Sequence, residues 1–155
     1  MGLNNQNPLS KMISKKTISL NVSARDWKEA VRIGGKILVE NGTVEERYIE
    51  GMIETVKTLG PYIVIAPGVA LPHARPEDGV IEPCMSLVTL KNPVNFGNEN
   101  NDPVKLVVCF ATVDHDAHIK AISKLARIIG DKEKLNRLFN AVKVDEIEEI
   151  ISAPV

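Results

Sequence analysis

Residues 63–77 read Ile63-Val64-Ile65-Ala66-Pro67-Gly68-Val69-Ala70-Leu71-Pro72-His73-Ala74-Arg75-Pro76-Glu77. The β-branched start predicts a short strand, and Pro67-Gly68 predicts a turn after it. Pro72 and Pro76 fix their own φ angles and bias the residue before each toward extended backbone. We therefore expect His73 on stiff backbone just after a strand, where a reactive side chain can be held in place.

A histidine in such a loop meets the needs of a nucleophilic imidazole. To attack phosphorus, the ring must be neutral on one nitrogen, oriented through the other, and accessible to a bulky donor. The alternative is a proline-rich connector that contains His73 incidentally. The local pattern alone gives the two interpretations roughly equal weight.

The rest of the chain alternates helical and extended patterns. An apolar-polar alternation predicts a strand at 18–22, and Ser23 is the expected cap of a helix over 24–41. A capping-box pattern at Thr43 and Glu46 predicts a second helix that ends at Gly60, with Tyr48 and Leu59 on its inward stripe. Further expected elements are strands at 84–90 and 104–112, the second of them central, and helices at 116–129, 131–140 and 144–152. This alternation predicts an α/β layered domain with a mixed sheet.

Composition is that of one ordinary globular domain. The chain has 155 residues, 44% hydrophobic and 25% charged, which is enough to bury a core. We expect residues 1–16 to form a flexible N-terminal lead-in and residues 17–155 to form a single domain. Nineteen basic and twenty acidic residues leave a net charge of −1, so the totals do not demand a nucleic-acid-binding surface.

Cysteines and apolar runs bear on the compartment. Cys84 and Cys109 lie in apolar strand-like runs, which favours buried, reduced thiols in a cytoplasmic protein. No apolar run is long enough to cross a membrane, and the N-terminus lacks a signal-peptide core. A role in transport would therefore make this chain a partner of the transporter, without membrane insertion of its own.

The motif Ala66-Pro-Gly-Val-Ala-Leu-Pro-His-Ala-Arg-Pro-Glu77 resembles the phosphorylation-site loop of enzyme IIA proteins of the bacterial sugar phosphotransferase system, in the mannitol/fructose group. Its His-Ala-Arg-Pro-Glu ending is most similar to the ascorbate branch, and the resemblance runs from about Ser23 to the end of the chain. It implies a three-layer α/β/α sandwich with a small mixed sheet flanked by helices. It also implies a phosphotransferase component, with no cofactor and no metal.

The resemblance implies a reaction and its partners. His73 would accept a phosphoryl group from the histidine-phosphocarrier protein HPr and pass it to a cysteine of the cognate IIB component, which serves a membrane IIC permease. The sugar would be ascorbate. A regulatory phosphorylation sensor, as in the nitrogen-related branch, would use the same His73 chemistry. Val69, Leu71 and Val80 around the loop are candidates for a transient partner contact, although for Leu71 a core position is favoured.

A second histidine follows the central strand, in the segment Thr112-Val-Asp-His-Asp-Ala-His118. Ligands of α/β sheets bind outside strand carboxyl ends, and a helix N-terminus offers free N–H groups to a phosphoryl group. The resemblance implies that His118 is the family's second active-site histidine, which would stabilise the phosphoryl group. His115 is extra by that comparison and is expected on the surface.

Two alternatives concern the neighbouring side chains. Arg75 would pair with phosphate as a planar donor or form a surface ion pair with Glu77 or Asp78. Mannitol-type relatives carry an arginine where this chain has Thr55, and our hypothesis is that Arg75 compensates.

A metal site is the rival chemistry for the same residues. It would use His115 and His118, with Asp114, Asp116 and His73 as further ligands. A His-x-x-His pair alone is a weak signal. A serine hydrolase has less support, since the chain has no Gly-x-Ser-x-Gly motif.

Overall fold

A five-stranded mixed sheet organises the chain, with the strand order β1-β4-β5-β3-β2. The computed structural model describes residues 7–113 and 115–154, and within helix α4 it describes side chains from residue 119 onward. Strand β4 pairs in parallel with β1 and antiparallel with β5, while β3 pairs in parallel with β5 and antiparallel with β2. The strands are β1 (Ile18–Val22), β2 (Val64–Ala66), β3 (Val69–Ala70), β4 (Cys84–Val94) and β5 (Val104–Ala111). The predicted central strand is confirmed as β5.

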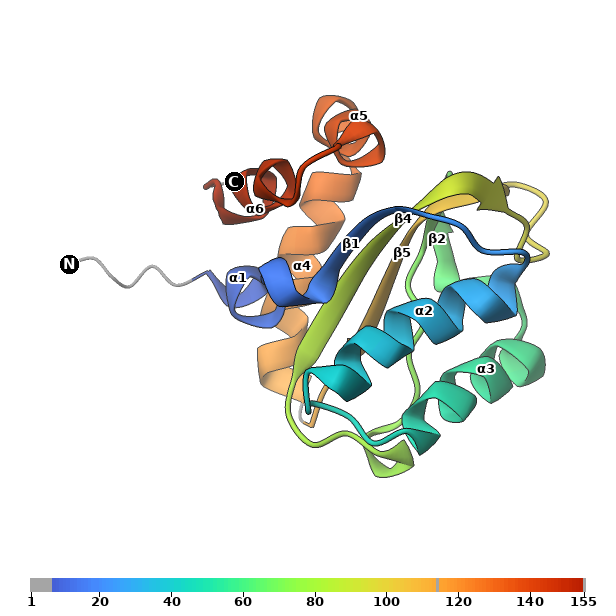
Figure 1. Cartoon of the computed structure of the whole chain (residues 1–155). Helices are drawn as coiled ribbons and strands as arrows, with labels where there is room; N and C mark the ends of the chain where they lie inside the picture. The colour runs from blue at the N-terminus through green and yellow to red at the C-terminus, as the bar shows by residue number, and fades with distance from the viewer. Residues whose placement is uncertain (1–6, 114, 155) are drawn as a thin grey trace.

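Helices cover both faces of the sheet (Figure 1). One face carries α2 (Trp27–Glu40) and α3 (Arg47–Leu59). The other carries α1 (Pro8–Met12), α4 (His115–Ile129), α5 (Lys132–Asn140) and α6 (Val144–Ser152). Alternate side chains of β5 enter separate cores: Cys109 packs on the α2 and α3 side, and Phe110 packs on the α4 side. The three-layer α/β/α architecture is confirmed.

Helix starts differ from two of the predictions. Helix α2 begins at Trp27, where the Asp26 carboxylate accepts from the Glu29 N–H at 2.9 Å, so Ser23 is not the cap. The predicted capping box at Thr43 is also wrong, because the Thr43 hydroxyl donates to the Leu38 carbonyl at 3.1 Å and closes off α2 instead. Both cases show a polar side chain choosing among nearby backbone partners.

The N-terminal segment differs from the predicted lead-in. Residues 1–6 lie outside the described residues, but Pro8–Met12 form helix α1, and Leu9 is fully buried. The Asn7 side chain accepts from the Leu9 N–H at 3.0 Å and donates to the Ile151 carbonyl at 3.0 Å. Segment 8–13 thus joins the α4-side core through its apolar side chains. In the sequence these apolar residues are interspersed with polar ones, so they give no clear helical pattern.

The segment before His73 forms a tight hairpin. Gly68, at φ +79°, provides the turn between β2 and β3. Two short 3₁₀ turns, Pro61–Ile63 and Pro76–Asp78, flank the segment, and a third, Lys15–Thr17, precedes β1. Val69 and Leu71 are buried and Val80 is half-buried, so Val69 and Leu71 belong to the core rather than to a partner contact. Within the described part of the chain, every helix is too short or too polar to cross a bilayer.

Candidate active site

The backbone just before His73 is tied to the sheet. The Leu71 N–H donates to the Ile63 carbonyl at 2.7 Å, and the Phe110 N–H donates to the Pro72 carbonyl at 3.0 Å. These bonds continue the pairing of β3 with its neighbours beyond the strand itself. They hold His73 at the end of a strand, as the sequence predicted, although its own side chain is only partly buried.

The His73 ring has one nitrogen engaged. Its Nδ1 atom lies 2.9 Å from the Leu71 carbonyl oxygen. A carbonyl oxygen only accepts, so the proton sits on Nδ1, and in the neutral ring the lone pair is left on Nε2. The ring stacks on Phe110, with centroids 4.6 Å apart and planes at 27°. Since the Phe110 side chain lies on the α4 side of the sheet, the nucleophile candidate is on that face.

The Tyr48 hydroxyl joins the two elements that hold the ring. It donates to the Phe110 carbonyl at 2.7 Å and accepts from the Ala74 N–H at 3.0 Å. Sequence reasoning assigned Tyr48 only to the apolar stripe of its helix. The available signal was chemical, because a buried tyrosine hydroxyl needs a partner and therefore points to a polar contact.

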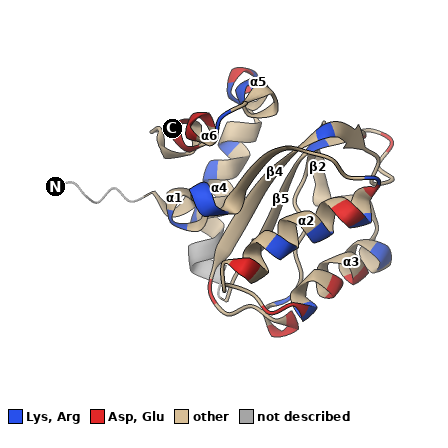
Figure 2. Cartoon of the chain, in the orientation of Figure 1, with Lys and Arg blue, Asp and Glu red and all other residues tan. Residues whose placement is uncertain are grey.

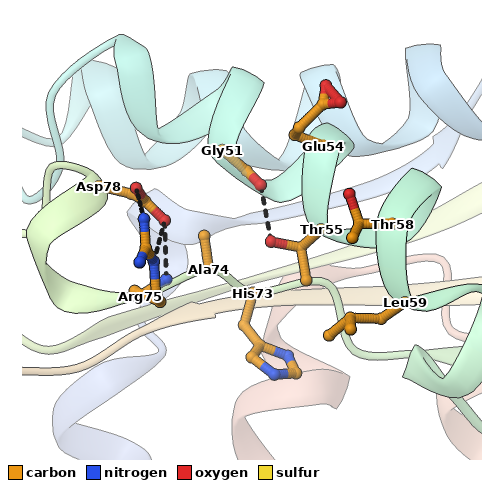
Figure 3. Close-up of a pocket in the computed structure, with 9 residues that line it drawn as sticks. All are labelled: Gly51, Glu54, Thr55, Thr58, Leu59, His73, Ala74, Arg75 and Asp78. Carbon is orange, nitrogen blue, oxygen red and sulfur yellow. Dashed lines mark hydrogen bonds and ion pairs between the residues drawn. The ribbon is translucent and has the colours of Figure 1, made fainter.

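A pocket of about 460 Å³ lies between His73 and helix α3. It is lined by Gly51, Glu54, Thr55, Thr58, Leu59, His73, Ala74, Arg75 and Asp78. Figure 3 shows the His73 ring pointing away from α3 while Thr55 donates to the Gly51 carbonyl at 2.8 Å. Thr55 is therefore at the pocket, in the position where mannitol-type relatives are expected to carry arginine.

Leu59 was predicted to point inward, and this is wrong. Its side chain is 60% exposed and lines the pocket. Helix α3 ends at Leu59, just before Gly60, and its last turn lines the pocket instead of packing on the sheet. The apolar periodicity of α3 continues in the sequence to Leu59, although the sheet no longer covers the helix at that point.

Arg75 lies at the pocket but is engaged by carboxylates. Its guanidinium is 3.3 Å from Asp78 Oδ1 and 3.8 Å from Glu77 Oε2, and the side chain is 73% exposed. Figure 3 shows it turned toward Asp78. The hydrogen bond from Arg75 lowers the pKa of the Asp78 carboxyl below its usual value. The predicted surface ion pair is thus present, and the phosphate role of Arg75 stays a prediction.

The second predicted histidine lies in the first turn of α4, which begins at His115. Phe110, which contacts the His73 ring, precedes that helix start by five residues, so the two backbones lie within about 17 Å of each other. The helix start and the His73 ring are thus at the same end of β5 and on the same face. The side chains of His115, Asp116 and His118, and all of Asp114, lie outside the described residues. The predicted role of His118 and the rival metal cluster both depend on them.

Charges around the site are mixed in sign. Figure 2 shows Lys and Arg interspersed with Asp and Glu along α2 and α3. At the pocket, Glu54 and Asp78 accompany Arg75. A phosphoryl group here would depend on local donors rather than on a broad positive surface.

Solved structures with the same fold align over most of this chain. The mannitol-specific cryptic phosphotransferase enzyme IIA CmtB from Escherichia coli is 36% identical, with a TM-score of 0.82 over 94% of this chain and 98% of that one. The complex of enzyme IIAMTL and phosphorylated enzyme IIBMTL from Escherichia coli contains a chain that is 28% identical, with a TM-score of 0.81 over 91% of this chain and 99% of that one.

Sequence comparison gives the same assignment. The ascorbate-specific PTS system EIIA component of Escherichia coli strain K12 is 40% identical over 141 residues, which is 90% of this chain and 92% of that protein. The family model described as "Phosphoenolpyruvate-dependent sugar phosphotransferase system, EIIA 2" matches residues 11–153. The resemblance read from the His73 motif is confirmed, and the chain belongs to the EIIA 2 family of the sugar phosphotransferase system.

Proposed function

We propose that His73 is the phosphoryl carrier of this phosphotransferase component and that its Nε2 atom is the nucleophile. The observation that carries the proposal is the hydrogen bond between Nδ1 and the Leu71 carbonyl, which directs the lone pair to Nε2. The stacked Phe110 ring and the tied backbone fix the direction of attack. Such pre-positioning is the main requirement of phosphoryl transfer.

The reaction consists of two displacements at phosphorus. Nε2 of His73 attacks the phosphohistidine of HPr, the donor P–N bond breaks, and the donor imidazole keeps the electron pair. A cysteine thiolate of the cognate IIB component then attacks the phosphoryl group on His73, and the neutral imidazole leaves. The structure of a related IIA with phosphorylated IIB supports the choice of acceptor. IIB in turn serves the IIC permease, and the proposal keeps the cytoplasmic location predicted from the sequence.

His118 completes the proposed site. The start of α4 follows β5 on the face that carries the His73 ring. Backbone N–H groups of the first turn of α4 and the His118 imidazole would stabilise the equatorial oxygens during transfer. No metal ion is needed for this chemistry, since the donor and acceptor sites use the same set of hydrogen-bond donors.

Phosphotransfer from labelled HPr tests the proposal. Wild type should be labelled, His73→Ala should take no label, and His118→Ala should be labelled slowly and in part. His115→Ala serves as the control and should match wild type. In wild type, ¹⁵N and ³¹P NMR should place phosphorus on Nε2. Labelling of His73→Ala at the wild-type rate, or failure of wild type to accept phosphate, would refute the assignment.

We propose ascorbate as the sugar, supported by the 40% identical ascorbate-specific relative. The phosphorylated chain should support ascorbate phosphorylation when it is combined with the IIB and permease components of an ascorbate system. Mannitol components should be served at a much lower rate. The reverse order of rates would assign a hexitol instead, and transfer to neither would favour a regulatory role.

A further inference from the structure

The buried hydroxyl of Tyr48 lies next to the nucleophile without touching it. Tyr48 lies in the first turn of helix α3, and its side chain is fully buried. Its oxygen is within hydrogen-bond distance of three backbone groups: the Phe110 carbonyl at 2.7 Å, the Ala74 N–H at 3.0 Å and the Ala74 carbonyl at 3.3 Å. A hydroxyl has one proton, and the shorter contact assigns it to Phe110.

These contacts close a ring of interactions around His73. Phe110 holds the imidazole by stacking, and its N–H holds the Pro72 carbonyl just before the histidine. Ala74 follows the histidine directly, and its N–H is held by Tyr48. Tyr48 therefore joins the residue after His73 to the strand residue that orients the ring.

We propose that Tyr48 is a positioning residue for His73. Its hydroxyl fixes the loop so that the Leu71 carbonyl stays in line with Nδ1 and the Phe110 ring stays under the imidazole. The proposal rests on His73 as the phosphoryl carrier. It adds that the hydroxyl of a core residue, which never contacts phosphate, sets the tautomer and the orientation of the nucleophile.

The hydroxyl itself has the properties that this role needs. Burial raises the pKa of Tyr48 well above its ordinary value. The group therefore stays protonated at physiological pH and keeps donating to Phe110. A hydroxyl is also able to donate and accept at once, which neither phenylalanine nor leucine at this position would do.

The variant Tyr48→Phe removes only this oxygen. We expect the maximal rate of phosphorylation to fall by about tenfold, because one hydrogen bond that orients His73 is lost. The KM for HPr should stay within about twofold, because the docking surface is unchanged. Exchange of the Ala74 amide should rise by about tenfold. The ¹⁵N shifts of His73 should move from a single Nδ1–H tautomer toward a mixture.

Two controls separate positioning from general destabilisation. Ser86→Ala removes another fully buried hydroxyl, which donates to the Gly34 carbonyl at 2.9 Å. It should lower the melting temperature while leaving the His73 tautomer and the maximal rate unchanged. Tyr62→Phe alters a tyrosine that is 82% exposed and should match wild type throughout.

The outcomes are distinguishable from those of the functional proposal. The tautomer and the amide exchange are measured in the unphosphorylated protein, so they test Tyr48 even if HPr does not donate. Should Tyr48→Phe fail to fold, wild type still provides a test: its Ala74 amide should exchange at least about tenfold more slowly than that of exposed Glu77. A variant with wild-type tautomer and rate, and only a lower melting temperature, would overturn the proposal. So would an unprotected Ala74 amide in wild type.

Discussion

At the scale of a single residue, ion pairs in the free chain occupy the Arg75 guanidinium, which we propose binds the phosphoryl group. The guanidinium is bound by Asp78 and Glu77 in the free chain, but these exposed pairs are weak enough to exchange for a phosphoryl group. Arg75→Ala should therefore slow phosphorylation of His73 by about tenfold to a hundredfold, because the transition-state charge loses one hydrogen-bond donor. Asp78→Asn, which loosens Arg75, should not slow it. Unchanged kinetics in Arg75→Ala would remove the proposed compensation for Thr55.

Leu59 gives a second prediction at the same scale. Its 60% exposed side chain lines the pocket beside His73, and an apolar group left in that position is suited to a transient protein contact. Leu59→Ala should raise the KM for HPr several-fold with little change in maximal rate. Stability should change by less than about 0.5 kcal/mol, as is usual for surface positions. Val142→Ala, at a 71% exposed position between α5 and α6, is the control and should change neither quantity.

Some residues of the site can be predicted from local sequence, and others cannot. His73 is flanked by two prolines, and this local signal was sufficient to predict its place after a strand. Tyr48 and Phe110 are 62 positions apart in the sequence and meet through one hydrogen bond. The chemical need of Tyr48 for a partner was visible, but the identity of that partner depends on the strand order, which no local pattern contains.

At the scale of elements, helix α2 packs tightly against the sheet at Gly34. A Cβ atom added at Gly34 would lie 2.6 Å from Cys109 Sγ and 3.3 Å from Ser86 Oγ. Gly34→Ala should therefore lower the free energy of unfolding by about 1–2 kcal/mol, because overpacking outweighs the gain in helix propensity. Urea denaturation measures this change.

A double-mutant cycle checks the cause. Cys109→Ala removes the sulfur atom that meets the new Cβ, so it should restore part of the loss in the Gly34→Ala background. The expected coupling is favourable and on the order of 1 kcal/mol. If the two substitutions are simply additive, the contact between α2 and β5 is not the source of the destabilisation.

Element boundaries were predicted unevenly for a physical reason. Helices α5 and α6 match the expected ranges, since apolar periodicity and a following break define them. The starts of α2 and α3 were misplaced because Ser23, Asp26 and Thr43 are all competent caps. Only the turn geometry selects among them. Helix α1 was missed because five residues carry too little periodicity to separate a helix from a loop.

For the molecule as a whole, the three layers followed from the alternation of helices and strands, whereas the sheet order did not. Strand β3 has two residues, yet it lies between β2 and β5 and positions the loop of His73. So short an element gives almost no signal of its own. Its place is set by pairing in parallel with the long, buried strand β5 on one side and antiparallel with the short strand β2 on the other.

The same buried centre predicts how the whole chain responds to alkali. Burial raises the pKa of Cys84 to about 11 and that of Cys109 to about 12. Below pH 9 both thiols are protonated in the folded and unfolded chains, so the stability they contribute is constant. Above pH 9 the unfolded chain releases these protons and the folded chain does not. The free energy of unfolding should therefore fall between pH 9 and 11, by about 2 kcal/mol per thiol.

Urea denaturation under reducing conditions at pH 8, 9, 10 and 11 measures this slope. Cys84→Ala and Cys109→Ala lose stability at pH 8 through packing, but each removes one titrating group. Their curves should decline less steeply than that of wild type, so that the difference in stability shrinks as the pH rises. Other alkaline groups, the lysines and Tyr48 among them, are common to all three proteins and cancel in the comparison. Parallel curves would mean that these thiols ionise as readily in the folded chain as in the unfolded one, which contradicts their burial between β4, β5 and α2.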